Sequence, residues 1–160
     1  MSDFVALDVM VEDEGWKAFI GDGADMCRQA AKLALPVKTP TEVSFVFTTD
    51  DAIAQLNAEY RGKEGSTNVL SFPLVQIAVG DPIPPMLGDV VMALGVVTSE
   101  AADAGIEVRD HILHLLIHGL LHLIGHDHET DEEAELMENE ERRLLASVGI
   151  ADPYAVSPTA

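Results

Sequence analysis

The chain carries a dense cluster of histidines, the side chains most often used to bind transition metals at neutral pH. All six histidines of the 160 residues lie between His111 and His128. Four of them fall on one face of a helix that the apolar pattern predicts over about 108–124, because an α-helix turns by about 100° per residue. They are His111, His114, His118 and His122. Burying several imidazoles without partners costs free energy, and a bound metal ion would provide a partner.

The spacing of three histidines predicts a metal site. His118 and His122 are four positions apart, so their side chains project together from neighbouring turns. Gly125 can adopt the positive φ that ends a helix, which brings His128 back as a third ligand. Three neutral imidazoles favour zinc, with nickel, cobalt or copper also possible. Three protein ligands leave a fourth position for water, as in catalytic zinc sites. The single cysteine, Cys27, excludes a cysteine-ligated zinc site and an internal disulfide, which favours a reducing compartment.

The remaining polar residues near this motif have less specific interpretations. A pair of histidines four apart is by itself more often ordinary core or surface histidine, so the glycine bend and the third histidine carry the metal prediction. We expect structural or solvent-exposed roles for His111 and His126. His114 either supports a metal ligand from behind or lines a substrate pocket. Asp127 either orients a ligand imidazole or caps the turn. No residue stands out as a general base.

The histidine motif also matches the metzincin protease pattern H-E-x-x-H-x-x-G-x-x-H at every position except one. Gly119 stands where those proteases have the glutamate that acts as general base. A metalloprotease without that carboxylate lacks its proton acceptor. The ligand set is therefore compatible with hydrolysis, while peptide cleavage is disfavoured.

Hydrophobic periodicity predicts an α+β fold that positions these residues. Strands are expected over 4–10, 42–48, 67–73 and 87–94, and helices over 18–35, 52–60, 98–104, 108–124 and 131–147. This order indicates a small mixed four-stranded sheet covered on one side by helices, with a buried C-terminal helix that carries the histidines. The length favours a single domain over 1–160.

The charge balance restricts the possible partners. Nine Lys+Arg against 28 Asp+Glu give a formal net charge of −19, and nine of the acids lie within 127–141. We interpret that run as a solvated helix face. The charge argues against a non-specific nucleic-acid coat, but not against a nuclease whose metal changes the local charge. No apolar run reaches the length of a membrane span and the first residues lack a secretory pattern, so we expect a cytoplasmic protein without a membrane partner.

Three separated blocks of the sequence resemble the bacterial YbeY family. The run His118-Gly-Leu-Leu-His-Leu-Ile-Gly-His-Asp-His128 resembles the family signature His-Gly-x-Leu-His-Leu-x-Gly-Tyr-Asp-His, with His126 in place of the tyrosine. A second block runs from Leu56-Asn-Ala-Glu-Tyr-Arg61 to Thr67-Asn-Val-Leu-Ser-Phe-Pro73, and the third is Leu87-Gly-Asp-Val-Val. The blocks keep the family's order and compatible spacing.

The resemblance implies a metal-dependent, single-strand-specific endoribonuclease that acts in ribosomal RNA maturation, including the 3′ end of the 16S RNA, and in ribosome quality control. It implies that His118, His122 and His128 hold zinc and that Arg61 is the basic residue of the active site. The implied partners are ribosomal RNA and the small ribosomal subunit, and not DNA. A second hypothesis is a metal-binding ribosome-assembly factor with little intrinsic cleavage activity. A third is a metal-dependent hydrolase of another substrate.

The basic residues are few and unevenly placed. The guanidinium of Arg61 can bind two phosphate oxygens at once, although a surface ion pair with Glu59 or Glu64 is an equally simple role. Six of the nine basic residues lie in the first 64 positions, so we expect an RNA groove along that half: Lys17, Arg28, Lys32, Lys38, Arg61 and Lys63. The acidic surface favours delivery to RNA by a protein partner, and the family resemblance implies a ribosomal protein or a GTPase in that role.

Overall fold

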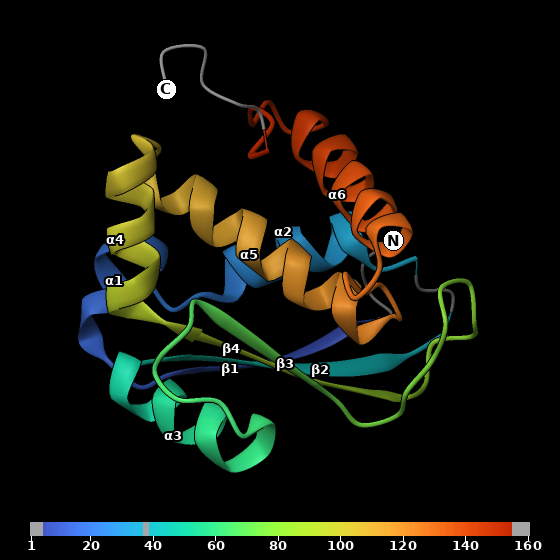
Figure 1. Cartoon of the computed structure of the whole chain (residues 1–160), viewed down its shortest axis with the longest axis horizontal. Helices are drawn as coiled ribbons and strands as arrows, with labels where there is room; N and C mark the ends of the chain where they lie inside the picture. Colours follow the sequence, from blue (N-terminus) through green and yellow to red (C-terminus); the bar gives the residue numbers. More distant parts are fainter. Residues whose placement is uncertain (1–4, 37–38, 155–160) are drawn as a thin grey trace.

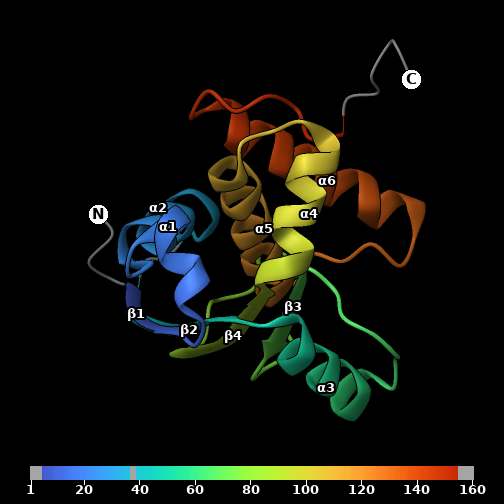
Figure 2. The same ribbon diagram turned by 90° about the vertical axis from the view of Figure 1, so that its left-hand side faces the viewer.

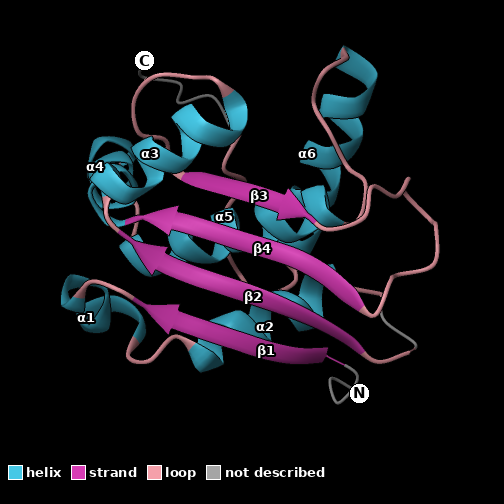
Figure 3. Ribbon diagram, turned by 90° about the horizontal axis from the view of Figure 1, so that it is seen from below, coloured by secondary structure: helices cyan, strands magenta, loops and turns pink. Residues whose placement is uncertain are grey.

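A twisted sheet of four strands forms the centre of the computed structural model, which describes residues 5–36 and 39–154 (Figure 1). The strands are β1 (Val5–Val11), β2 (Thr41–Thr48), β3 (Val69–Pro73) and β4 (Met86–Ala93), in the spatial order β1-β2-β4-β3. Strands β1, β2 and β4 run parallel, and β3 runs antiparallel to β4 at one edge of the sheet (Figure 3). The predicted α+β class and the mixed four-stranded sheet are confirmed.

One face of the sheet is covered by α2 (Ala24–Ala34) and α5 (Val108–Leu123), which pack side by side. Helix α4 (Leu94–Ala104) continues directly from β4 and packs beside α5, while α6 (Asp131–Ala146) lies on the outer side of α5 (Figure 2). Helix α5 is apolar almost all round and is therefore buried, as predicted. No helix in the described part of the chain is long and apolar enough to cross a bilayer.

The opposite face of the sheet also carries a helix, so the prediction of helices on one side only is wrong. Helix α3 (Asp50–Arg61) lies below the sheet in Figure 1. Its Ile53 is fully buried and packs in a small second core with Leu70, Val91 and Ala93. Strands β3 and β4 present apolar side chains to both faces, and the second face excludes water only when a helix covers it.

Element boundaries differ from prediction where glycine allows a turn. The helix predicted over 18–35 is divided into α1 (Lys17–Ile20), which follows a 3-10 turn over Glu14–Trp16, and α2. Gly21 and Gly23 between them have φ angles of 59° and 84°, which lie in the region that favours glycine. The helix predicted over 98–104 begins at Leu94. The predicted first strand starts at Phe4, which lies outside the described residues.

Cys27 is fully buried in α2, and we predict that it is inert in the folded protein. Burial, with a smaller contribution from Asp22, raises the pKa of its thiol to about 12. Because the thiolate is the reactive form, labelling with Ellman's reagent at pH 8 should be at least about a hundredfold slower in native than in urea-unfolded protein. Equal labelling rates in the two states would contradict this packing.

Candidate metal centre and active site

The three histidines predicted as ligands come together at the C-terminal end of α5. His118 and His122 lie on successive turns of the helix, and His128 follows the turn that begins at Gly125. Each of the three offers one ring nitrogen, and these atoms all lie within 4.8 Å of one another. The Nε2 atoms of His118 and His122 are 3.1 Å apart. The three nitrogen atoms are therefore close enough for one ion to contact all three rings.

The protonation of the first two rings indicates that a cation belongs between them. Nδ1 of His118 lies 3.0 Å from a carboxylate oxygen of Glu141, and Nδ1 of His122 lies 2.9 Å from the backbone carbonyl of His126. Both oxygens can only accept a hydrogen bond, so both Nδ1 atoms carry the proton. When both rings are neutral, the two Nε2 atoms, 3.1 Å apart, carry lone pairs that face each other. This donor set fits a divalent transition metal, which prefers neutral imidazole ligands.

The environment of His122 keeps its ring neutral. Burial, together with the neighbouring His118 and His128, lowers the pKa of His122 to about 4. Protonation of His122 itself therefore does not relieve the contact between the two Nε2 atoms at neutral pH. A metal ion would relieve it without requiring a proton.

Glu141 of α6 is the centre of a buried polar cluster behind the metal ligands. Its carboxylate is fully buried and accepts hydrogen bonds from His118, His114 and the hydroxyl of Tyr154. Burial acts to raise the pKa of Glu141, but these hydrogen bonds outweigh it and lower the pKa to about 2. A carboxylate on the far nitrogen of a ligand histidine fixes the ring's tautomer and orientation. Glu141 thus orients His118 toward the other two histidines.

The sequence interpretation missed this residue, because it assigned the acids of 127–141 to a solvated face. Glu141 is instead on the buried side of α6, with Met137 one turn before it and Leu144 and Leu145 one turn after it. A single acid in line with an apolar stripe was the available signal. Tyr154, which follows the last helix, carried no such signal.

The other histidines and Asp127 have supporting roles. His111 hydrogen bonds to Glu100, a structural role as predicted. His114 does not line the cavity and contacts Glu141, so the structure supports the role behind a metal ligand.

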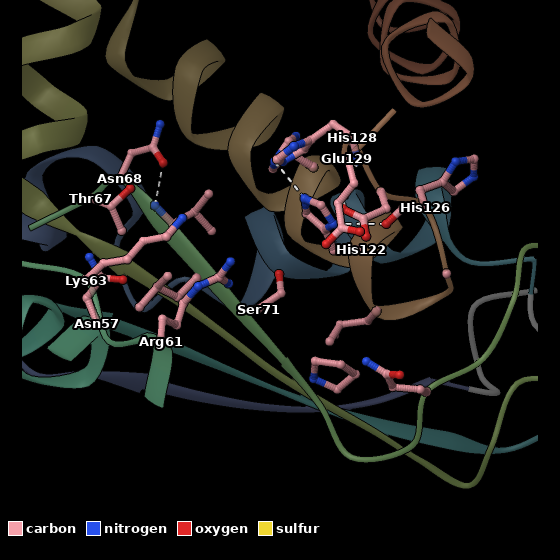
Figure 4. Close-up of a pocket in the computed structure, with 18 of the residues that line it drawn as sticks. Asn57, Arg61, Lys63, Thr67, Asn68, Ser71, His122, His126, His128 and Glu129 are labelled. Atoms are coloured by element: carbon pink, nitrogen blue, oxygen red, sulfur yellow. Dashed lines mark hydrogen bonds between the residues drawn. The ribbon is translucent and has the colours of Figure 1, made fainter. Parts of the chain in front are cut away.

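The ring of His126 points away from His122 and His128 in Figure 4, while its carbonyl orients His122. Asp127 accepts a hydrogen bond from the backbone N–H of His128, so it caps the turn.

Two glycines of the histidine motif are required by close packing. Gly125 has a φ of 110°, and a Cβ there would lie 2.7 Å from the backbone of Ile77, Ala78 and Val79. A Cβ on Gly119 would lie 2.8 Å from Val90. The position that carries the glutamate base in metzincins therefore faces the sheet here, with no room for that side chain.

Arg61 lies across a cavity from the histidines. It is the last residue of α3, and the chain turns sharply at Gly62, with a φ of 64°. The amide of Asn57 donates to the carbonyl of Gly65 and holds the following loop in place. Arg61 forms no ion pair within the described residues, so the predicted alternative of a pair with Glu59 or Glu64 is not observed.

The cavity between Arg61 and the histidines has a volume of about 560 Å³. Its walls come from the end of α3 and the loop after it, from β3, and from the end of α5 and the turn after it (Figure 4). Among the described residues, Arg61 and Lys63 are the only arginine and lysine that line it. Of the basic residues expected along an RNA groove, Arg61 and Lys63 line this cavity, whereas Lys17, Arg28 and Lys32 do not. Lys38 lies outside the described residues.

Comparison with known proteins finds relatives over most of the chain. Residues 8–149 match the family model described as "Endoribonuclease YbeY". The chain is 46% identical over 151 residues to the Endoribonuclease YbeY of Maricaulis maris, covering 93% of this chain and 91% of the relative. It is 41% identical over 159 residues to that of Bartonella henselae, covering 94% and 98%.

A solved structure shares the fold. The solution structure of TM1509 from Thermotoga maritima superposes with a TM-score of 0.57 at 22% identity, covering 94% of this chain and all of that one. That likeness concerns the fold alone. The family match over most of the chain, together with relatives above 40% identity, establishes that this protein belongs to the Endoribonuclease YbeY family.

Proposed function

We propose that this chain, as a single domain, is a zinc-dependent endoribonuclease that cleaves single-stranded RNA. The observation that carries the proposal is the convergence of three histidine nitrogens, with the Nε2 atoms of His118 and His122 3.1 Å apart, and Arg61 across the cavity. The relatives from Maricaulis maris and Bartonella henselae are named endoribonucleases, which supports the same activity for this chain.

In this proposal each residue has a defined task. His118, His122 and His128 would hold the ion, with Glu141 and the His126 carbonyl keeping two of the rings in the correct tautomer. Bound zinc supplies Lewis acidity toward a phosphoryl oxygen. The guanidinium of Arg61 binds two oxygens of the same phosphate and stabilises the negative charge that develops on it. Lys63 attracts the RNA backbone at the mouth of the cavity.

The biological role follows from family membership and from the charge. We propose that the substrate is ribosomal RNA, including the 3′ end of the 16S RNA of the small subunit, and that the protein also serves ribosome quality control in the cytoplasm. A net charge of −19 gives little general attraction to RNA. Delivery by a ribosomal protein or a GTPase would supply that attraction. Tight binding to bare RNA at physiological salt would make such a partner unnecessary.

The test is cleavage of a labelled single-stranded RNA by untagged protein. Replacing Arg61 with alanine should lower kcat/KM about a hundredfold or more, because the phosphate loses its bidentate partner. Metal content and fold should be unchanged, since Arg61 contacts none of the three histidines. R61K should give an intermediate rate, because lysine keeps the charge without the planar fork.

The matched control is Arg28→Ala, which removes an exposed arginine that lies outside the cavity. Its rate should stay within about twofold of the wild type. A chelator should stop cleavage by the wild type. If wild type, R61A and chelated protein all cut equally, the activity belongs to a contaminant, and a metal-binding assembly factor with little cleavage activity becomes the better hypothesis.

A further inference from the structure

The free edge of β3 forms one wall of the cavity. In an antiparallel pair, alternate residues direct their N–H and C=O groups toward the neighbouring strand and the others direct them away. The carbonyl of Asn68 accepts from Ala93 of β4, and the N–H of Leu74 donates to Leu87. With the observed register, residues 68, 70, 72 and 74 face β4. Val69, Ser71 and Pro73 therefore direct their backbone groups outward, and all three line the cavity.

This edge is rich in acceptors. The N–H of Val69 is already bonded to the Asn68 side chain at 2.6 Å, and Pro73 has no N–H. What remains is one donor, the N–H of Ser71, and three acceptors, the carbonyls of Val69, Ser71 and Pro73. No hydrogen bond to these four groups occurs within residues 5–36 and 39–154. The cavity wall thus offers unsatisfied backbone groups in a fixed order.

The edge is held rigidly beside the proposed chemistry. The hydroxyl of Ser71 donates to the carbonyl of Gly119 on α5 at 2.9 Å, between the two turns that carry His118 and His122. Asn68 is itself fixed by Glu100 at 3.0 Å. In Figure 4, Ser71 lies between Arg61 and His122. A ligand group on this edge would lie next to a phosphate bound between the arginine and the histidines.

We propose that the free edge of β3 binds the Watson–Crick edge of an unpaired nucleobase next to the cleaved bond. This inference rests on the proposed endoribonuclease function and gives its single-strand preference a physical cause. The neighbouring Val69 carbonyl and Ser71 N–H match the amino donor and ring-nitrogen acceptor that adenine and cytosine place side by side. In a duplex the same base groups are already paired, so a paired base cannot bind here.

The order of the groups distinguishes a base from other occupants. A phosphate offers acceptors only, so three carbonyls disfavour it. An extended peptide brings one N–H and one C=O for every outward residue. The N–H of Val69 is already bonded to Asn68 and Pro73 has no N–H, so only one of the three donors that the peptide carbonyls would need remains. The amino groups of nucleobases can donate hydrogen bonds to the additional carbonyl oxygens of this edge. The observations therefore favour RNA over a peptide on this edge.

The test uses untagged wild-type protein and a fluorescent single-stranded oligonucleotide. Adenosines of the oligonucleotide are replaced one position at a time. Purine riboside removes the amino donor, 1-deazaadenosine removes the ring acceptor, and 7-deazaadenosine changes the opposite edge as a control. Dissociation constants from anisotropy and kcat/KM are measured for each. At one position beside the cleaved bond, the first two replacements should weaken binding and lower kcat/KM about tenfold, while 7-deazaadenosine has little effect.

A pair of protein variants assigns the contact to the strand edge. Ser71→Pro removes the outward N–H without removing a bond to β4, which edge strands tolerate, and Ser71→Ala removes only the hydroxyl. S71P should bind adenosine and 1-deazaadenosine RNA equally, whereas S71A should still distinguish them. The base series in the wild-type protein decides the question even where S71P fails to fold.

The outcomes separate this inference from the proposed function. If unmodified RNA is cleaved but no position distinguishes purine riboside from 7-deazaadenosine, the inference is overturned and the nuclease stands. If RNA is bound but not cleaved and the pattern appears in the dissociation constants, the inference stands and the nuclease does not. The inference is also overturned if the protein binds no RNA. It is overturned likewise if the base replacements change nothing and an extended peptide competes with the RNA for binding.

Discussion

Replacing His122 with alanine is expected to remove the metal from this protein. His122 supplies one of three converging nitrogens, and its Nε2 lies 3.1 Å from that of His118. Loss of one ligand from a three-histidine site should weaken zinc binding about a hundredfold or more. The remaining ion would be held by two rings, one of them on the exposed His128. Metal content of untagged protein, measured by mass spectrometry after dialysis, checks this.

The matched control is His111→Ala on the same helix. His111 bonds to Glu100 and lies outside the group of converging nitrogens, so this variant should retain the metal. Zinc should also raise the melting temperature of the wild type and of H111A, but not of H122A, because only a bound ligand stabilises the folded state. Full metal occupancy in H122A would show that the ligands are assigned incorrectly.

Replacing Glu141 with alanine is expected to cause the largest loss of stability among single changes near the site. Three hydrogen-bonding groups lose their acceptor together, one on the buried His114 and two on the partly buried His118 and Tyr154. Leaving buried polar groups unsatisfied costs about 1–3 kcal/mol each, so the metal-free protein should lose about 3 kcal/mol or more. Urea unfolding in the presence of a chelator measures this loss without a contribution from the metal.

Glu141→Gln tests the orienting role separately from the fold. The amide keeps the volume and one acceptor oxygen, but it replaces the second oxygen with a donor that faces the histidines. Zinc affinity should fall about 10–100-fold, and nitrogen chemical shifts of His118 should report a loss of the single Nδ1–H tautomer. Glu135→Ala, an exposed acid on the same helix, is the control and should change neither quantity. Unchanged zinc affinity and tautomer in E141Q would remove the orienting role.

The metal triad could be predicted because it depends on short-range geometry. Helix pitch places His118 and His122 on adjacent turns, and Gly125, at a φ of 110°, returns the chain so that His128 joins them. All these positions lie within 11 residues, where backbone geometry alone limits the distances. The family resemblance rested on the same motif and on two blocks upstream.

The partners of these residues could not be predicted in the same way. The acids of 127–141 looked uniform in sequence, yet Glu141 alone among them is fully buried and contacts His118. An amphipathic pattern shows which face of α6 is buried, but the polar group it meets depends on how α6 docks on α5. The position of Arg61 could not be predicted either. Only the packing of α3 beneath the sheet directs its side chain to the cavity rather than to Glu59 or Glu64.

By itself, the sequence determined the α+β class, the family, the three converging histidines and the exclusion of a cysteine-ligated zinc site. The family follows from the resemblance of three sequence blocks. The other features follow from local periodicity, spacing or composition, which do not depend on how the chain packs. The tertiary structure alone decided that helices cover both faces of the sheet, that Glu141 and Tyr154 stand behind the ligands, and that the edge of β3 opens into the cavity. Those features join segments far apart in sequence, and only the packing of the helices against the sheet sets their distances.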